Sequence, residues 1–120
     1  MSVPHTPNEV VLQLTELSRQ LAEATVALNK ADDDAVQARE AAKLAEAKAF
    51  LSAEGSVDAR KAQAIEATHE VRLAAEVADA LVRGHQRTVR TLQTRIDVGR
   101  TLSATVRSEI SLAGSGVYGS

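Results

Sequence analysis

The chain has 120 residues, of which 44% are hydrophobic and only 2% aromatic, and its formal net charge is −2 at pH 7. This length suits one domain, and a composition dominated by Ala, Glu, Lys, Leu and Arg is typical of long helices and coiled coils. Cysteine is absent, which excludes disulfides, thiolate metal sites and thiol nucleophiles. No apolar run reaches the roughly 18 residues that a membrane-spanning helix needs. We therefore predict an all-α protein without a membrane span, located in the cytoplasm.

The first predicted helix covers residues 8–54, after a disordered lead-in at residues 1–7. Asn8 is the expected N-cap, and Glu9 lies in the first turn, where a negative charge is favourable. Apolar residues then recur in alternating steps of three and four, which predicts a left-handed coiled coil. The two positions of this repeat are Leu14, Leu21, Leu28, Ala35, Ala42 and Ala49, and Val10, Leu17, Ala24, Ala31, Ala38 and Ala45.

A turn is predicted at residues 55–56, between two helical segments. Gly55 suits the residue that follows a helix C-terminus, because glycine adopts a positive φ without strain. Ser56 suits the N-cap of the next helix, and Asp58 lies in its first turn. The second predicted helix covers residues 57–113 and carries its own apolar stripe, and residues 114–120 are predicted to form a flexible tail.

The two predicted helices complement each other when they are aligned antiparallel about the turn. Facing residues then have numbers that sum to roughly 110, so Leu17 faces Leu92 and Leu14 faces Ile96, while small residues face each other near the turn. We therefore predict a long antiparallel two-helix coiled-coil hairpin at residues 8–113. The same register places three glutamates near arginines, which are Glu9 near Arg100, Glu16 near Arg95, and Glu23 near Arg87.

Such a hairpin is expected to associate with itself. A buried Ala methyl contributes only about 0.8 kcal/mol, so two Ala-rich helices hold each other weakly. The second helix also extends past the start of the first. We predict a four-helix or larger homo-oligomer, with an oligomer or partner surface at Leu102, Val106, Ile110 and Leu112.

Arginine placement provides a second candidate site. Arg83, Arg87 and Arg90 follow one another at helical spacing on one face of the second helix. They are predicted contacts for a nucleic-acid backbone. The alternative is that these arginines pair with glutamates of the first helix, which the acidic pI near 5.9 and the scarcity of aromatic residues favour.

Other polar residues do not form a recognisable catalytic or metal site in the sequence. Asp32, Asp33 and Asp34 lack the glycine and closing glutamate of a calcium loop, so we expect a solvated acidic patch. His69 and His85 are too far apart on one helix to share a metal, and His85 is expected to pack against small residues. No pair of residues has nucleophile–base spacing. We predict no enzymatic activity, no metal and no cofactor.

Two segments carry a resemblance to a known group of proteins. Glu54 to Ala62 reads EGSVDARKA, and Arg95 to Glu109 reads RIDVGRTLSATVRSE, with an Ala-rich helix before them. Over about residues 45–109, this layout resembles small coiled-coil proteins encoded by actinobacterial phages. The resemblance implies a phage accessory or host-interaction role in the host cytoplasm, and it implies no site residues.

These observations favour a non-enzymatic coiled-coil protein that forms oligomers and acts through a protein partner. The alternative is a nucleic-acid-associated accessory protein that uses the arginines of the second helix. A third hypothesis is an oligomer that binds a small ligand in a pocket between subunits.

Overall fold

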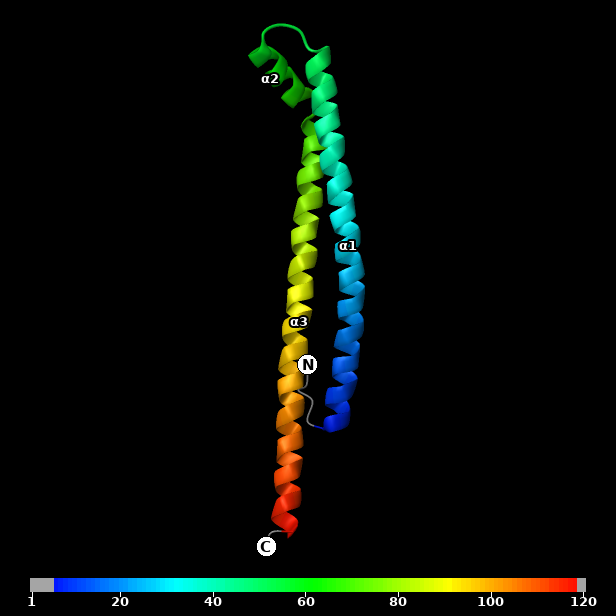
Figure 1. Ribbon diagram of the computed structural model, residues 1–120, viewed down its shortest axis with the longest axis vertical. Coiled ribbons are helices and arrows are strands. Elements are labelled where there is room, and N and C mark those ends of the chain that lie inside the picture. The colour runs from blue at the N-terminus through cyan, green and yellow to red at the C-terminus, as the bar shows by residue number, and fades with distance from the viewer. Residues whose placement is uncertain (1–5, 119–120) are drawn as a thin grey trace. The chain divides into compact units, whose positions relative to one another are not determined.

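The computed structural model describes residues 6–118, which form three helices (Figure 1). These are α1 (Pro7–Ser52), α2 (Val57–Ala67) and α3 (His69–Tyr118). The chain divides into two compact units, which we describe separately: unit 1 is residues 1–25 with 87–120, and unit 2 is residues 26–86. Within each unit, a segment of α1 packs antiparallel against a segment of α3 (Figure 1). The predicted all-α fold, with two long antiparallel helices and a short connector, is confirmed.

The N-terminus of α1 is closed by a capping box. The hydroxyl oxygen of Thr6 accepts a hydrogen bond from the backbone N–H of Glu9, at 3.2 Å. The Glu9 carboxylate in turn accepts one from the backbone N–H of Thr6, at 3.4 Å. Pro7 occupies the first helical position, where a missing N–H costs nothing. The cap is therefore Thr6, and the prediction of Asn8 was wrong; residues 1–5 of the predicted lead-in lie outside the described residues.

The turn after α1 follows the local signals in the sequence. Gly55 has φ of 106°, a conformation that glycine tolerates and other residues rarely adopt. Ser56 caps α2, because its side-chain oxygen accepts a hydrogen bond from the N–H of Ala59 at 3.2 Å. Asp58 lies in the first turn of α2. The predicted roles of these three residues at the bend are confirmed.

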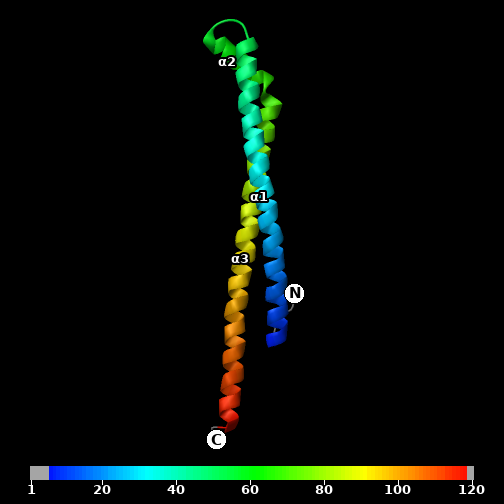
Figure 2. The ribbon, with the colours of Figure 1, turned by 45° about the vertical axis from the view of Figure 1, so that its right-hand side comes forward.

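The second helical segment is interrupted at Thr68, between α2 and α3 (Figure 2). Thr68 is buried, and both its backbone N–H and its hydroxyl donate to the carbonyl of Ala64, at 3.1 and 2.7 Å. The guanidinium of Arg72 donates to the carbonyl of Ile65 at 2.6 Å, close to the C-terminus of α2. A cation stabilises the negative end of a helix. The prediction of one helix over residues 57–113 therefore needs correction, because the chain forms two helices there. The side chains of Thr68 and Arg72 donate to carbonyl groups at the end of α2 and so stabilise the break.

Unit 1 has a core of large aliphatic residues. Leu17 from α1 packs with Leu92 and Ile96 from α3, and the sequence predicted that Leu17 faces Leu92. Leu14, Leu21 and Ala24 pack against this cluster from α1. Val10 and Val106 are also buried in unit 1.

Unit 2 has a core of small residues. Its buried hydrophobic side chains are all alanines, namely Ala31, Ala35, Ala42, Ala64 and Ala75. One ion pair crosses between its helices, where the Arg39 guanidinium lies 2.6 Å from the Asp79 carboxylate. The sequence analysis did not predict this pair.

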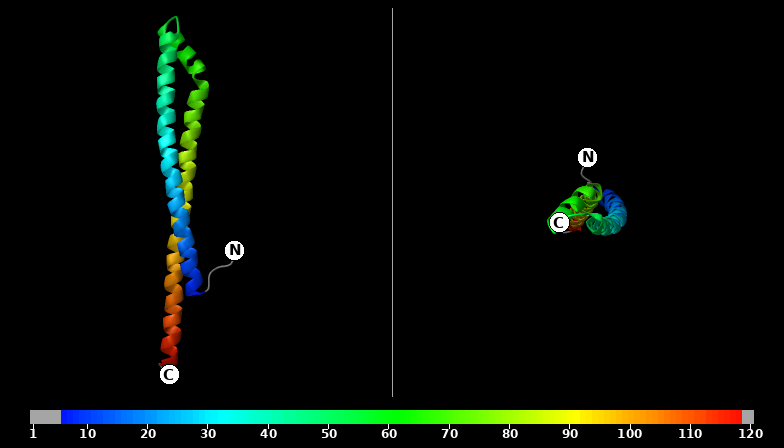
Figure 3. Two further views of the ribbon diagram at one scale, coloured as in Figure 1. Left: turned by 90° about the vertical axis from the view of Figure 1, so that its right-hand side faces the viewer. Right: turned by 90° about the horizontal axis from the view of Figure 1, so that it is seen from above.

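The C-terminal end of α3 continues beyond the beginning of α1 in unit 1 (Figure 3, left view). α3 is helical to Tyr118, so it includes residues 114–118 of the predicted flexible tail. Residues 119–120 lie outside the described part of the chain. Ile110 and Leu112 of this terminal segment are exposed at 54% and 73% of their surfaces.

Candidate functional site

The exposed surface of the described residues is rich in large apolar side chains. Five of these side chains belong to unit 1, namely Val11, Leu12, Val98, Ile110 and Leu112. Nine belong to unit 2, namely Val26, Val36, Leu44, Leu51, Val57, Ile65, Leu73, Val77 and Leu81. Large exposed apolar patches mark interaction sites in soluble proteins. The exposed residues of unit 2 therefore make it a candidate binding surface.

An apolar groove lies between the end of α1 and α2 in unit 2. It has a volume of about 570 Å³, and its apolar lining includes Phe50, Leu51 and Ala64. Lys43 and Lys61 line it as well, and their aliphatic stems add apolar surface below the charged amines. This groove suits an apolar side chain or a helix face of a partner, because its walls are mostly hydrocarbon.

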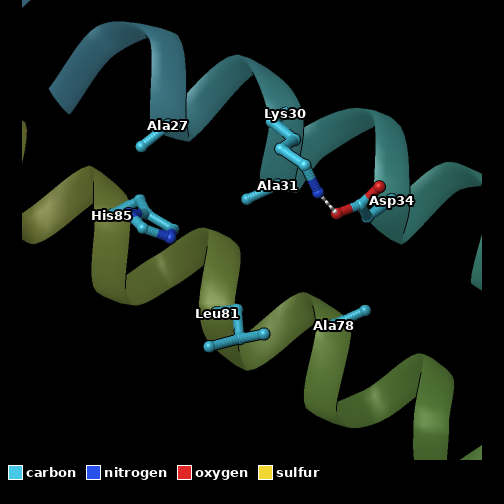
Figure 4. A pocket seen from close by; sticks show the side chains of 7 residues that line it. All are labelled: Ala27, Lys30, Ala31, Asp34, Ala78, Leu81 and His85. Carbon is cyan, nitrogen blue, oxygen red and sulfur yellow. Dashed lines mark hydrogen bonds and ion pairs between the residues drawn. The ribbon is translucent and has the colours of Figure 1, made fainter. Parts of the chain in front are cut away.

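A smaller groove of about 280 Å³ lies between α1 and α3 in unit 2 (Figure 4). His85 of α3 stands opposite Ala27 of α1, and Leu81 of α3 lies along the same groove (Figure 4). On the α1 side, the Lys30 amine is 2.9 Å from the Asp34 carboxylate, which raises the pKa of Lys30 through that hydrogen bond. The sequence predicted that His85 packs against small residues, and three alanines, Ala27, Ala31 and Ala78, line the groove beside it.

The predicted arginine site is divided between the two units. Arg83 belongs to unit 2, whereas Arg87 and Arg90 belong to unit 1, and all three are exposed. The glutamates that the sequence placed beside such arginines have another partner. Glu16 and Glu23 both accept hydrogen bonds from Arg19, one turn away on α1. The predicted pairs of Glu16 with Arg95 and of Glu23 with Arg87 were therefore wrong.

Arg19 also changes the acidity of its neighbour. Hydrogen bonds, first from Arg19 and then from Gln20, lower the pKa of Glu16 from 4.5 to about 2. The same contact raises the pKa of Arg19 above its usual value. Partners three or four residues apart on one helix compete with partners on another helix, and here the local pairs form.

The four residues of the predicted oligomer surface differ in exposure. Val106 is buried within unit 1 at 8%, and Leu102 is half-buried. Of the predicted surface, Ile110 and Leu112 are the residues that the single chain leaves exposed.

The acidic patch on α1 is helical and exposed. Asp32, Asp33 and Asp34 all lie on the surface, and Asp34 pairs with Lys30. Among residues 6–118, no group of three or more His, Cys, Asp or Glu side chains is placed to hold a metal ion. None of the described helices is long and apolar enough to cross a membrane.

The sequence analysis did not single out the exposed apolar face of α3 in unit 2. We call this face the second apolar face; it consists of Leu73, Ala74, Val77, Ala80 and Leu81. All five residues are exposed. The signal in the sequence is the spacing of Leu73, Val77 and Leu81, which lie four apart beside the predicted seam.

Comparisons of the chain with protein-family models, with curated protein sequences and with solved structures give no match.

Proposed function

We propose that this protein is a non-enzymatic, homo-oligomeric helical hairpin that acts by binding other protein chains. The observation that carries the proposal is the distribution of apolar side chains in unit 2. Nine large apolar residues of this unit are exposed, while its buried hydrophobic positions hold only alanine. Burial of apolar surface is the main favourable contribution to protein association. Association would place these side chains in a core that the single chain does not provide.

A phage accessory or host-interaction role is part of this proposal. It is supported by the resemblance of the turn segment and of residues 95–109 to small phage coiled-coil proteins. A cytoplasmic location, in the host if the protein is phage-encoded, is also proposed. The absence of cysteine suits such a reducing compartment.

Self-association is tested by the mass of the purified protein in solution. One chain has a mass of 12.7 kDa, and at micromolar concentration we expect at least twice this value by sedimentation or native mass spectrometry. Dilution should lower the mean mass, because an association of this kind is reversible. A single-chain mass over the whole micromolar range would contradict the proposal.

Binding of a further protein is tested with two matched variants. Leu44 and Leu51 are exposed in unit 2 at 57% and 78%, and Leu12 is exposed in unit 1 at 62%. Proteins that the native chain captures from a host lysate should be lost with Leu44→Gln/Leu51→Gln and kept with Leu12→Gln. Equal capture by all three chains would show that the exposed residues of unit 2 are not the contact surface.

Nucleic-acid binding is the second candidate function. It is supported by the ion pairs that Glu16 and Glu23 form with Arg19. Because Glu23 pairs with Arg19, it is not the partner of Arg87 that the sequence predicted. Exposed arginines such as Arg83, Arg87 and Arg90 suit a phosphate backbone. Binding of labelled DNA or RNA should then weaken steeply with salt, and each arginine that contacts a phosphate should lower the slope by about 1 when it is replaced by Gln. No binding at low salt would eliminate this candidate.

A further inference from the structure

We infer that the second apolar face of α3 pairs with the same face of a second copy, antiparallel, about a two-fold axis at Val77. This inference rests on the proposed self-association and specifies its surface and register. The occupant is another copy of this chain, because the face is complementary to itself.

The first observation is that α3 has more apolar surface in unit 2 than its partner α1 covers. One apolar face includes Val71, Ala75, Ala78, Val82 and His85, all of which are buried or half-buried. The second apolar face lies beside it, with Leu73, Val77 and Leu81 exposed at 48%, 52% and 57%. A helix that is apolar over most of its circumference is usually buried on more than one side. The second apolar face therefore lacks a covering element within unit 2.

The second observation is the pattern of charge along α3. Between Leu73 and Leu81 the only charged residues are Glu76 and Asp79, and neither belongs to the second apolar face. Both lie in directions close to those of Arg72 and Arg83, which form a separate charged face at helical spacing. Over residues 73–81, a neighbouring helix can therefore approach the second apolar face without burying an unpaired charge.

The third observation is that the face reads the same in both directions. Positions three residues before and after Val77 are Ala74 and Ala80, and positions four residues before and after it are Leu73 and Leu81. In a two-fold symmetric interface, residue i of one copy contacts residue j of the other, and j contacts i. Antiparallel pairing about Val77 would place Leu73 against Leu81 of the second copy and alanine against alanine. A heterologous partner has no reason to select this symmetry.

Charge and size at the ends of the face agree with the same register. One more step outward places Glu70 opposite Gly84 of the second copy, so no two like charges face each other. Small side chains at Ala74, Ala80 and Gly84 allow the two helices to approach closely. The groove at Leu81 and His85 borders the face toward α1 and offers room at its edge (Figure 4). Pairing of two copies in this way would bring four helical segments together.

The exposed surface of α1 provides an alternative face centred on Leu44. It has Ala41 and Ala47 on either side, but Glu40 and Lys48 interrupt it four residues away in each direction. Within four residues of its centre it thus holds one large apolar residue, whereas the second apolar face holds three. Leu44 is exposed at 57%, similar to Val77 at 52%, so it gives a matched position for the test.

Disulfide trapping tests the register, because the native chain has no cysteine to interfere. The single-cysteine variants are Val77→Cys, Leu44→Cys, Leu73→Cys and Leu81→Cys, each oxidised mildly and analysed without reductant. A disulfide requires two Cα atoms within about 7 Å, so only facing positions form one readily. We expect Val77→Cys to give the covalent dimer on the order of tenfold faster than Leu44→Cys, because the interface raises the effective concentration of its thiols.

Direction of pairing is tested by mixing. A mixture of Leu73→Cys and Leu81→Cys chains should form mixed dimers faster than either variant alone forms its own. Faster trapping of Leu73→Cys alone would overturn the antiparallel arrangement, because only parallel copies place this residue against itself.

The mass of each variant under reducing conditions separates the two proposals. A dimeric mass without preferential trapping at Val77 would overturn the register while self-association stands. A monomeric mass for the native chain would overturn both. Val77→Glu places two carboxylates at the axis, so its dimer should dissociate while the helix content measured by circular dichroism is kept; an unchanged mass for this variant would also overturn the inference.

Discussion

The two units use the same antiparallel helix pair with cores of different size. Unit 1 buries Val10, Leu17, Leu92, Ile96 and Val106, whereas every hydrophobic residue buried in unit 2 is an alanine. A buried leucine contributes about 1.5 to 3 kcal/mol, whereas a methyl contributes about 0.8 kcal/mol. Unit 1 is therefore stabilised mainly by contacts within one chain, and unit 2 has more to gain from a second chain. Sequence periodicity alone does not distinguish these two cases, because alanine and leucine both occupy seam positions.

The largest expected effect is loss of the leucine core of unit 1. Leu17→Ala removes a side chain that packs with Leu92 and Ile96. We expect a loss of about 2 to 5 kcal/mol in the free energy of unfolding, because the cavity is surrounded by aliphatic residues that relax only in part. Urea unfolding followed by circular dichroism measures it.

Leu12 provides the control for this prediction on the same helix. It is 62% exposed, so Leu12→Ala should change the free energy of unfolding by no more than about 0.5 kcal/mol. Equal losses for Leu12→Ala and Leu17→Ala would mean that the leucine core does not stabilise unit 1.

A smaller loss of stability is expected when a buried alanine of unit 2 is replaced by a larger residue. Ala35 is buried at 1%, so Ala35→Leu adds three carbons where the helices leave no room for them. Overpacking of this kind costs about 1 to 3 kcal/mol, and we expect a lower thermal midpoint. Val36→Leu is the matched control, because Val36 is 50% exposed on the next residue. A gain in stability with Ala35→Leu would show that the helices of unit 2 are not closely packed.

A substitution at the bend is expected to cost less stability than the changes in the two cores. Gly55→Ala places a Cβ on a residue with φ of 106°, and an L-residue with positive φ costs about 1 to 2 kcal/mol. Space is not the cause, because the added Cβ would lie 3.4 Å from the Cβ of Ala59, an ordinary contact. Unfolding by urea measures the loss, and the change should also favour an opened chain that pairs with another copy. An unchanged stability and mass would contradict this role of Gly55.

The smallest expected effect is the pH dependence of the local ion pairs in unit 1. Arg19 and Gln20 depress the pKa of Glu16, so the contribution of this carboxylate is complete above pH 4.5 and is lost as the pH falls toward about 2. Carbon-13 NMR of the Glu16 carboxyl should give a midpoint near 2 in the native chain. Arg19→Gln should return that midpoint toward 4.5. A midpoint that is the same in both chains would show that Arg19 does not hold this carboxylate.

Residues at the turn show how much of the fold is predictable from sequence. Gly55 and Ser56 act through their own backbone and side-chain geometry, so their roles could be predicted from a few neighbouring residues. The capping box of Thr6 and Glu9 is equally local, and the cap is Thr6 and not the predicted Asn8. The break at Thr68 has a weaker local signal, because its stability depends on the guanidinium of Arg72 reaching the carbonyl of Ile65.

The candidate binding surface was predicted less well than the fold. The terminal residues Ile110 and Leu112 are exposed as expected, but Val106 is buried. The second apolar face around Val77 was not identified, because the heptad reading assigns one face to the core and says nothing of a second. The arginine partners were also assigned incorrectly, since Arg19 binds both Glu16 and Glu23 within one helix.

The sequence by itself determined that the chain forms two antiparallel helices with a bend at Gly55, because heptad periodicity, capping and a positive φ are properties of neighbouring residues. Only the tertiary structure decided which apolar side chains are buried, where the second segment breaks and which ion pairs form. These outcomes depend on the distance between helices, which alanine reduces and leucine increases. They also depend on competition between partners one turn away and partners on the other helix.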